Sequence, residues 1–234
     1  MKPSILLVIF AFFMSSCAEL GQISREIAKS GMLSEQQIAN GLQQALSKGV
    51  TEQVSKLTEE DGFYDNALVR IELPEELSKI ESTLRSFGLG NLADQGIKAL
   101  NETAQEAVKE ATPIFLNAIR DMSFQEARTI LLGEKTAATA YLREKTQTEL
   151  YQKFKPVVQE NFQKVGADQI WDNLITQYNQ VPFTDKVNPD LTDYVTSEAL
   201  RGVYKMIELE EIQIRNDLNE RSTELLRRVF ALQD

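Results

Sequence analysis

From residue 34 onward, apolar residues recur every three or four positions, which is the spacing of one face of an α-helix. The clearest run begins at Ser34, where Gln37 three residues later predicts a capping box, and continues through Leu57. The same spacing, with Ser, Asn, Pro or Gly at the ends, predicts further helices over 74–87, 91–110, from Pro113, over 123–133, 136–165 with a break at Pro156, 167–179, from 191, and over 219–231. The pattern predicts an all-α fold, a multi-helix bundle.

Residues 58–73 interrupt this helical pattern. Asp61-Gly62 is a turn signal, and residues 67–73 then alternate apolar and polar side chains, which predicts at most a short extended segment. No linker rich in Gly, Ser or Pro divides the chain, and no repeat is visible. We therefore expect residues 34–234 to form a single helical domain.

The first 16 residues have the pattern of an export signal. Lys2 supplies a positive charge, and the apolar run Ser4–Met14 is too short to span a bilayer. The run ends in Met-Ser-Ser before Cys17, which resembles the lipobox of bacterial lipoproteins. We expect residues 1–16 to be removed and Cys17 to carry lipid. The alternative is an ordinary secretory signal followed by an incidental cysteine.

Lipid on Cys17 would anchor the chain to a membrane, since two or more acyl chains give stable attachment. Residues 17–33 would then form the lipidated N-terminus and a tether. Ala18 follows the cysteine, and no Asp stands there to indicate retention at the inner membrane. By analogy with enteric sorting, we expect a bacterial envelope protein at the outer membrane, facing the periplasm.

The charge of the chain restricts its partners. The formal charge is −10, and removal of Lys2 with the signal makes it −11. A surface of this sign repels nucleic acid and anionic lipid headgroups. We therefore expect no nucleic-acid partner, and we expect the domain to stand off the membrane on its tether.

The residue types exclude several chemistries. The chain contains no histidine, and its one cysteine is Cys17. These absences exclude Ser-His-Asp and Cys-His catalysis and metal sites built on imidazole. We expect no metal, no cofactor and no enzymatic activity. A pair of carboxylates stays open as a catalytic device, because the 35 acidic residues offer many pairs.

The irregular, aromatic segment after Asp61 is a candidate binding site. Tyr64 and Asn66 could form hydrogen bonds to a ligand, and Arg70 could pair with a carboxylate or phosphate. The alternative is a packed loop in which Phe63 and Tyr64 fill the core and Arg70 bonds carbonyls at a helix end.

A second candidate is the turn before the helix predicted from residue 191. Asn188, Asp190 and Thr192 place oxygen ligands at alternating positions, like part of a calcium loop. The Gly and the distal Glu of an EF-hand are missing, and a helix N-cap explains Asp190 without a ligand.

Several stretches, in order along the chain, resemble one family. They are DGFYDNALVRIELPEEL (61–77), TPIFLNAIRDMSFQEARTILLG (112–133), TAATAYLREKT (136–146), FKPVVQE (154–160) and VNPDLTDYVTSEAL (187–200). They resemble the bacterial family called domain of unknown function 4197, over roughly residues 34–230. The resemblance implies an exported, helical envelope protein, often with a lipoprotein signal. It carries over no catalytic residues, because the family has no assigned activity.

One departure from the family is the segment Gly133–Thr139, which reads GEKTAAT where we expect an acidic residue beside the Ala-Ala-Thr. The sequence as a whole favours a non-enzymatic interaction or scaffold domain with an envelope protein as its partner. A carrier of a lipid or other apolar ligand is the first alternative. A glycan hydrolase that uses two carboxylates is the second.

Overall fold

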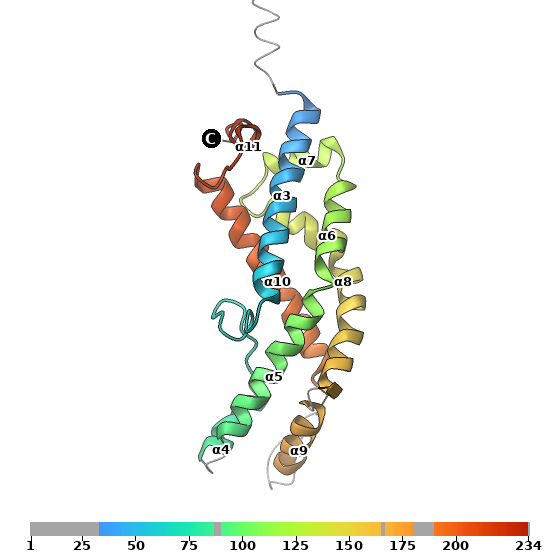
Figure 1. Cartoon of the computed structure of the whole chain (residues 1–234), viewed down its shortest axis with the longest axis vertical. Coiled ribbons are helices and arrows are strands. Elements are labelled where there is room, and N and C mark those ends of the chain that lie inside the picture. The colour runs from blue at the N-terminus through green and yellow to red at the C-terminus, as the bar shows by residue number, and fades with distance from the viewer. Residues whose placement is uncertain (1–32, 87–89, 165–166, 180–189, 234) are drawn as a thin grey trace, which may run out of the picture.

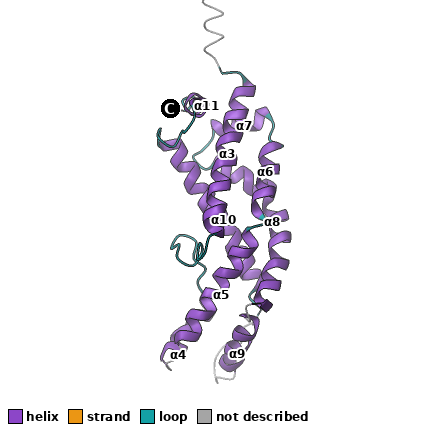
Figure 2. Ribbon diagram, in the orientation of Figure 1, coloured by secondary structure: helices purple, strands orange, loops and turns teal. Residues whose placement is uncertain are grey.

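The structure is a computed structural model, and it describes residues 33–86, 90–164, 167–179 and 190–233. Every regular element in these ranges is an α-helix (Figure 2). The helices are α3 (Glu35–Thr58), α4 (Glu75–Ser86), α5 (Gly90–Val108), α6 (Ala111–Arg120), α7 (Phe124–Leu131), α8 (Ala137–Lys164), α9 (Ala167–Asn179), α10 (Thr192–Asn216) and α11 (Glu224–Phe230). The predicted all-α bundle is confirmed.

The helices form an elongated bundle (Figure 1). The long helix α10 packs against α8, α3 and α5, and the buried apolar side chains form one continuous core. Helices α4 and α9 lie at one end of the long axis, whereas α7, α11 and the start of α3 lie at the other (Figure 1). We call this second end the tether end, because residue 33 leads into α3 there. None of the helices in the described ranges has the length and apolarity needed to cross a membrane.

The predicted capping box at Ser34 is confirmed, and a second one starts α7. The Ser34 hydroxyl accepts a hydrogen bond from the Gln37 N–H at 3.2 Å, and Gln37 Oε1 accepts one from the Ser34 N–H at 2.9 Å. Ser123 and Glu126 make the equivalent pair of bonds at the start of α7. These reciprocal bonds satisfy N–H groups that have no partner inside the helix, which fixes where α3 and α7 begin.

The predicted break at Pro156 is wrong, because α8 continues through this residue. A proline inside a helix removes one hydrogen bond and costs about 3 kcal/mol. Pro156 is exposed, and so is Gln152, whose carbonyl loses its partner and can bind water. On the opposite face, Phe154 and Val158 are fully buried on either side of the proline. Their burial offsets the cost of the missing bond.

The last helix is shorter than predicted, whereas the segment 67–73 agrees with the prediction of at most a short extended segment. The last helix begins at Glu224 and not near residue 219, because Thr223 caps it by accepting a hydrogen bond from the Leu226 N–H at 3.1 Å. Residues 67–73 contain no strand, although Val69 and Ile71 are buried and Glu72 is exposed, as the alternation indicates.

Candidate functional site

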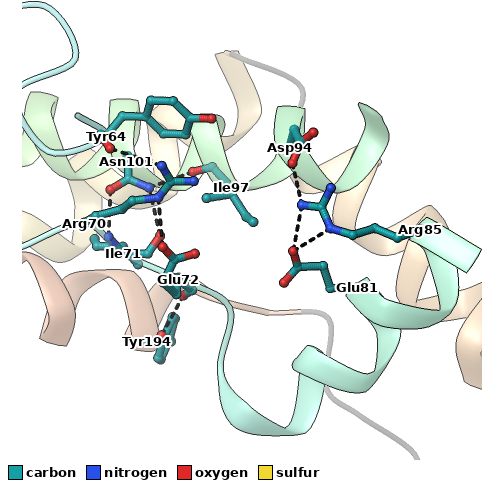
Figure 3. A network of polar contacts seen from close by, with 10 residues as sticks. All are labelled: Tyr64, Arg70, Ile71, Glu72, Glu81, Arg85, Asp94, Ile97, Asn101 and Tyr194. Atoms are coloured by element: carbon teal, nitrogen blue, oxygen red, sulfur yellow. Dashed lines mark hydrogen bonds and ion pairs between the residues drawn. The ribbon is translucent and has the colours of Figure 1, made fainter. Parts of the chain in front are cut away.

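Two of the predicted binding residues, Tyr64 and Arg70 of the loop 61–72, lie close together (Figure 3). The Arg70 guanidinium stacks 4.2 Å from the centre of the Tyr64 ring, and its Nε lies 2.9 Å from Glu72 Oε1. Arg70 Nη1 also donates to the Tyr64 carbonyl at 3.5 Å. The charge of Arg70 is therefore engaged within the loop, so a bound anion would have to compete with Glu72.

The side chain of Asn66 also makes its contacts within the protein. Its Oδ1 accepts a hydrogen bond from the Leu68 N–H at 3.1 Å, and its Nδ2 lies 3.7 Å from the Met206 sulfur. The neighbouring Phe63 is fully buried. These contacts close the loop on itself and onto α10. The prediction that Tyr64, Asn66 and Arg70 bind a ligand stays a prediction.

Asn101 of α5 holds the end of this loop (Figure 3). Its Oδ1 accepts a hydrogen bond from the Ile71 N–H at 2.8 Å, and its Nδ2 donates to the Ile71 carbonyl at 2.8 Å. The same Nδ2 donates to the Ile97 carbonyl at 2.8 Å. The Asn101 side chain therefore satisfies both the N–H and the carbonyl of Ile71, as a neighbouring β-strand would. The alternating segment needs no sheet for this purpose.

The second predicted site lies partly outside the described residues, since Asn188 is among those not described. Asp190 is exposed, and its Oδ1 accepts a hydrogen bond from the Thr192 N–H at 2.9 Å, at the start of α10. The N-cap residue of α10 is Leu191, which makes no side-chain capping bond, so the predicted N-cap role of Asp190 is wrong. The bond from Asp190 instead closes an Asx-type turn just before the helix.

A hollow of about 350 Å³ has the acidic lining that a carboxylate-pair enzyme would need. However, Lys98 Nζ lies 3.4 Å from Asp61 Oδ1 and 3.9 Å from Glu102 Oε1. Glu106, which also lines it, pairs with Lys109. Three of the four carboxylates thus lie beside a lysine, whereas glycoside hydrolysis uses two carboxyl groups that face the substrate. The hollow gives the hydrolase hypothesis no support.

The α7–α8 groove is the more suitable binding site. It is an open hollow of about 720 Å³ with a mostly apolar lining. Its lining residues are Ser123, Gln125, Glu126, Thr129, Ile130, Gly133, Glu134, Thr136, Ala137, Ala140, Tyr141 and Glu144. A second hollow, of about 400 Å³, shares three of these residues, Thr136, Ala140 and Glu144. The two hollows therefore lie on either side of one stripe of the α8 surface.

Small residues bring the two helices of the groove together. A Cβ atom at Gly133 would lie 2.9 Å from the Thr129 carbonyl oxygen and 3.0 Å from the Ala137 methyl group. Only glycine therefore allows the end of α7 to approach the start of α8 so closely. The apolar floor next to this corner is formed by Ala137 and Ala140.

The polar groups of the groove have fixed roles. The Tyr141 ring is partly buried, and burial is the main cause that raises the pKa of its phenol, so the hydroxyl stays protonated and can donate a hydrogen bond. Lys145 lies 5.4 Å from the centre of this ring and 3.3 Å from Glu126 Oε1. Within the described part of the chain, the carboxylates of Glu134 and Glu144 have no ion-pair partner and give the rim a negative charge.

A buried ion pair holds the corner behind the groove. Glu211 of α10 accepts hydrogen bonds from the Ala138 and Thr139 N–H groups at 2.9 and 2.8 Å. Arg215 donates to Glu211 at 3.0 Å and to the carbonyls of Ile130 and Leu131. A carboxylate thus lies beside the Ala-Ala-Thr in space, although it is supplied by α10 and is used to cap α8.

The capping box at Ser123 predicts a pH dependence. Three interactions lower the pKa of Glu126 below its ordinary 4.5. The largest is the hydrogen bond from the Ser123 N–H, followed by the bond from the Ser123 hydroxyl and then by the interaction with Lys145. A lowered pKa means that the carboxylate stabilises the fold above pH 4.5 and loses this effect as the pH falls through the folded value. Glutamine keeps an oxygen acceptor for the Ser123 N–H, as Gln37 does for Ser34, so Glu126→Gln removes only the charge and should cost about 0.5 kcal/mol at pH 7.

Urea unfolding at a series of pH values checks this expectation. The difference between the parent and Glu126→Gln should be constant above pH 5 and should shrink as the pH falls below 4.5. In a Ser123→Ala background the difference should be somewhat smaller, because the carboxylate loses the bond from the Ser123 hydroxyl but keeps the bond from the backbone N–H of residue 123. If the two proteins differ in stability by the same amount at pH 3 and pH 7, the ionised Glu126 carboxylate does not stabilise the fold as proposed.

Comparison with protein-family models identifies the family of the chain. The model described as protein of unknown function (DUF4197) matches residues 32–231, almost the whole domain. The chain belongs to this family. Comparison with curated proteins and with solved structures finds no match.

The groove coincides with the stretches that identify the DUF4197 family. All its lining residues except Glu134 lie within the stretches 112–133 and 136–146. Sequence reasoning did not single them out as a site, because each helix alone has an ordinary amphipathic pattern. The available signal was the small-residue spacing around Gly133, Ala137 and Ala140 between two helices of defined ends.

Proposed function

We propose that this chain is a non-enzymatic, lipid-anchored envelope protein that binds a polypeptide partner in the α7–α8 groove. The observation that carries the proposal is the shape and chemistry of the groove. Its apolar floor can bury an apolar side chain, and Tyr141 adds an aromatic wall with a hydroxyl donor. The two unpaired glutamates at the rim, Glu134 and Glu144, favour Lys or Arg beside that side chain.

The sequence supports the lipid anchor and the location. The apolar run of residues 4–14, the small residues before Cys17 and the absence of Asp after it favour lipid attachment and outer-membrane sorting. The envelope position would place the groove in the periplasm. Exported proteins and lipoproteins that pass through this compartment are then the available polypeptide partners.

A carrier function is less well supported by the shape of this groove. Sites for small apolar ligands bury most of the ligand surface. The α7–α8 groove is open to solvent and has glutamates at its rim, which would leave an acyl chain exposed next to negative charge. A peptide, which contributes only one or two side chains and keeps its backbone in water, fits such a groove better.

The proposal is tested by photo-crosslinking in cells. A photoreactive amino acid is placed at Ala140 in the full-length chain, because this residue is exposed in the groove. We expect one dominant crosslinked polypeptide whose attached segment combines apolar and basic side chains. Charge reversal of Glu134 and Glu144 together should lower its yield about tenfold, which corresponds to about 1.4 kcal/mol.

The control is Glu149→Lys, an exposed glutamate of α8 that does not line the groove. This variant changes the net charge in the same direction and should leave the crosslinking unchanged. Crosslinks to many abundant proteins, or equal losses in both charge variants, would overturn the peptide-binding proposal. A crosslink to lipid alone would overturn it in favour of a carrier.

A further inference from the structure

The exposed large apolar side chains are concentrated at the tether end of the bundle. Five such residues are found in the described part of the chain. Phe124 is the first residue of α7, and Leu132 directly follows that helix. Leu218 lies in the turn after α10, and Leu232 lies in the segment after α11. These elements lie where α3 begins (Figure 1), and α3 packs against both α7 and α11. The fifth, Leu68, lies in the loop 61–72 beyond the other end of α3.

The apolar face of α7 at this end is separate from its groove face. Phe124, Arg128 and Leu132 follow one another at four-residue spacing, so they share one side of the helix. All three are exposed. The groove is lined from α7 by a different set that includes Glu126 and Thr129.

The tether end also differs in charge from the rest of the chain. Residues 118–137 and 216–233 each hold three basic and three acidic residues, whereas the whole chain has a formal charge of −10. Arg128, Arg227 and Arg228 are exposed among the apolar residues. Arg221 is buried and Glu35 at the start of α3 is exposed, so the surface of this end is slightly acidic. The electrostatic repulsion from a lipid headgroup layer is therefore weaker here than for the chain as a whole.

We propose that the tether end is a membrane-contacting surface that rests against the lipid headgroup layer. This inference depends on the proposed anchor at Cys17. The 16 residues from there to Leu33 span at most about 55 Å, so the anchor permits contact without forcing it. Exposed Phe and Leu side chains surrounded by Arg are the composition that interfacial segments use at a lipid surface. The domain then stands upright on the membrane, with α4 and α9 furthest from it.

Tryptophan fluorescence in vesicles tests this orientation. The lipidated protein is inserted into vesicles of phosphatidylethanolamine with a minority of phosphatidylglycerol, with and without a spin-labelled lipid that quenches tryptophan. The native Trp171 is buried and supplies a constant background. The variants are Phe124→Trp and Leu232→Trp, whose parent residues are 47% and 48% exposed. The control is Leu68→Trp, whose parent residue is at least as exposed, at 58%.

We expect the spin-labelled lipid to quench the new tryptophan at 124 and 232 at least twofold more than at 68. Equal quenching at all three positions, or none at 124 and 232, would overturn the proposal and leave the domain standing off the membrane. Mass spectrometry of the purified protein first establishes whether Cys17 is acylated. If Cys17 is not acylated, the proposed lipid anchor is wrong, independently of the proposed orientation. The orientation can then still be tested after the Cys17 thiol is coupled to a maleimide lipid.

Discussion

Replacing Glu211 by alanine is expected to lower the free energy of unfolding by about 3–5 kcal/mol. The carboxylate and its partner Arg215 are both only 4% exposed, and their closest N and O atoms are 2.9 Å apart. Without Glu211, the Arg215 charge stays buried with only carbonyl and amide oxygens to accept its hydrogen bonds. The N–H groups of Ala138 and Thr139 at the start of α8 also lose their acceptor.

Urea unfolding of the full chain measures this loss, and Glu208→Ala on the same helix is the control. Glu208 pairs with Lys205 at the surface, and such a pair contributes about 0–1 kcal/mol. A Glu211→Leu, Arg215→Met double variant should lose less stability than the sum of the two single variants, because it leaves no buried charge unpaired. A loss below 1 kcal/mol for Glu211→Ala would contradict the burial of the pair.

The same ion pair bears on the proposed binding groove. Arg215 bonds the last carbonyls of α7, and Glu211 bonds the first N–H groups of α8, so α10 fixes the angle between the two groove helices. We infer that partner binding depends on α10 although no residue of that helix lines the main hollow. A loss of crosslinking at Ala140 in Glu211→Ala under conditions where the chain is still folded would agree with this inference.

The elements of the fold were predictable because their signals are local. A capping box such as that of Ser123 and Glu126 needs only residues three positions apart, and helical burial follows from periodicity. The break at Pro156 was predicted wrongly, since a local cost was weighed without the burial of Phe154 and Val158 across the helix. Local reasoning overestimates a helix breaker wherever the apolar face continues past it.

The candidate groove and the ion pair behind it were not predictable in this way. Glu211 and Arg215 are four residues apart, which is also the spacing of an ordinary exposed pair on a helix surface. Only the packing of α10 against α8 buries them. The groove likewise exists only where α7 meets α8. Such features depend on contacts between helices, and a single sequence contains no direct record of these contacts.

Asn101 is another such residue, and Asn101→Leu is expected to cost about 3 kcal/mol. Leucine has a similar shape but provides no hydrogen bonds, so the N–H and the carbonyl of Ile71 lose their partners. Ile71 is fully buried and Asn101 is 1% exposed, so water cannot replace the amide without opening the loop. Urea unfolding gives the loss in stability, and Asn91→Leu, an exposed asparagine of the same helix, should change it little.

Hydrogen exchange at Ile71 separates this effect from a general loss of stability. In Asn101→Leu, the Ile71 N–H should exchange faster by a larger factor than N–H groups in the middle of α10, because its own acceptor is gone. The stacking of Arg70 on Tyr64 lies next to Ile71 in the chain and should loosen with it (Figure 3). Equal acceleration at Ile71 and in α10 would show that Asn101 stabilises the bundle as a whole, and that the loop with the predicted Tyr64, Asn66 and Arg70 site is held by other contacts.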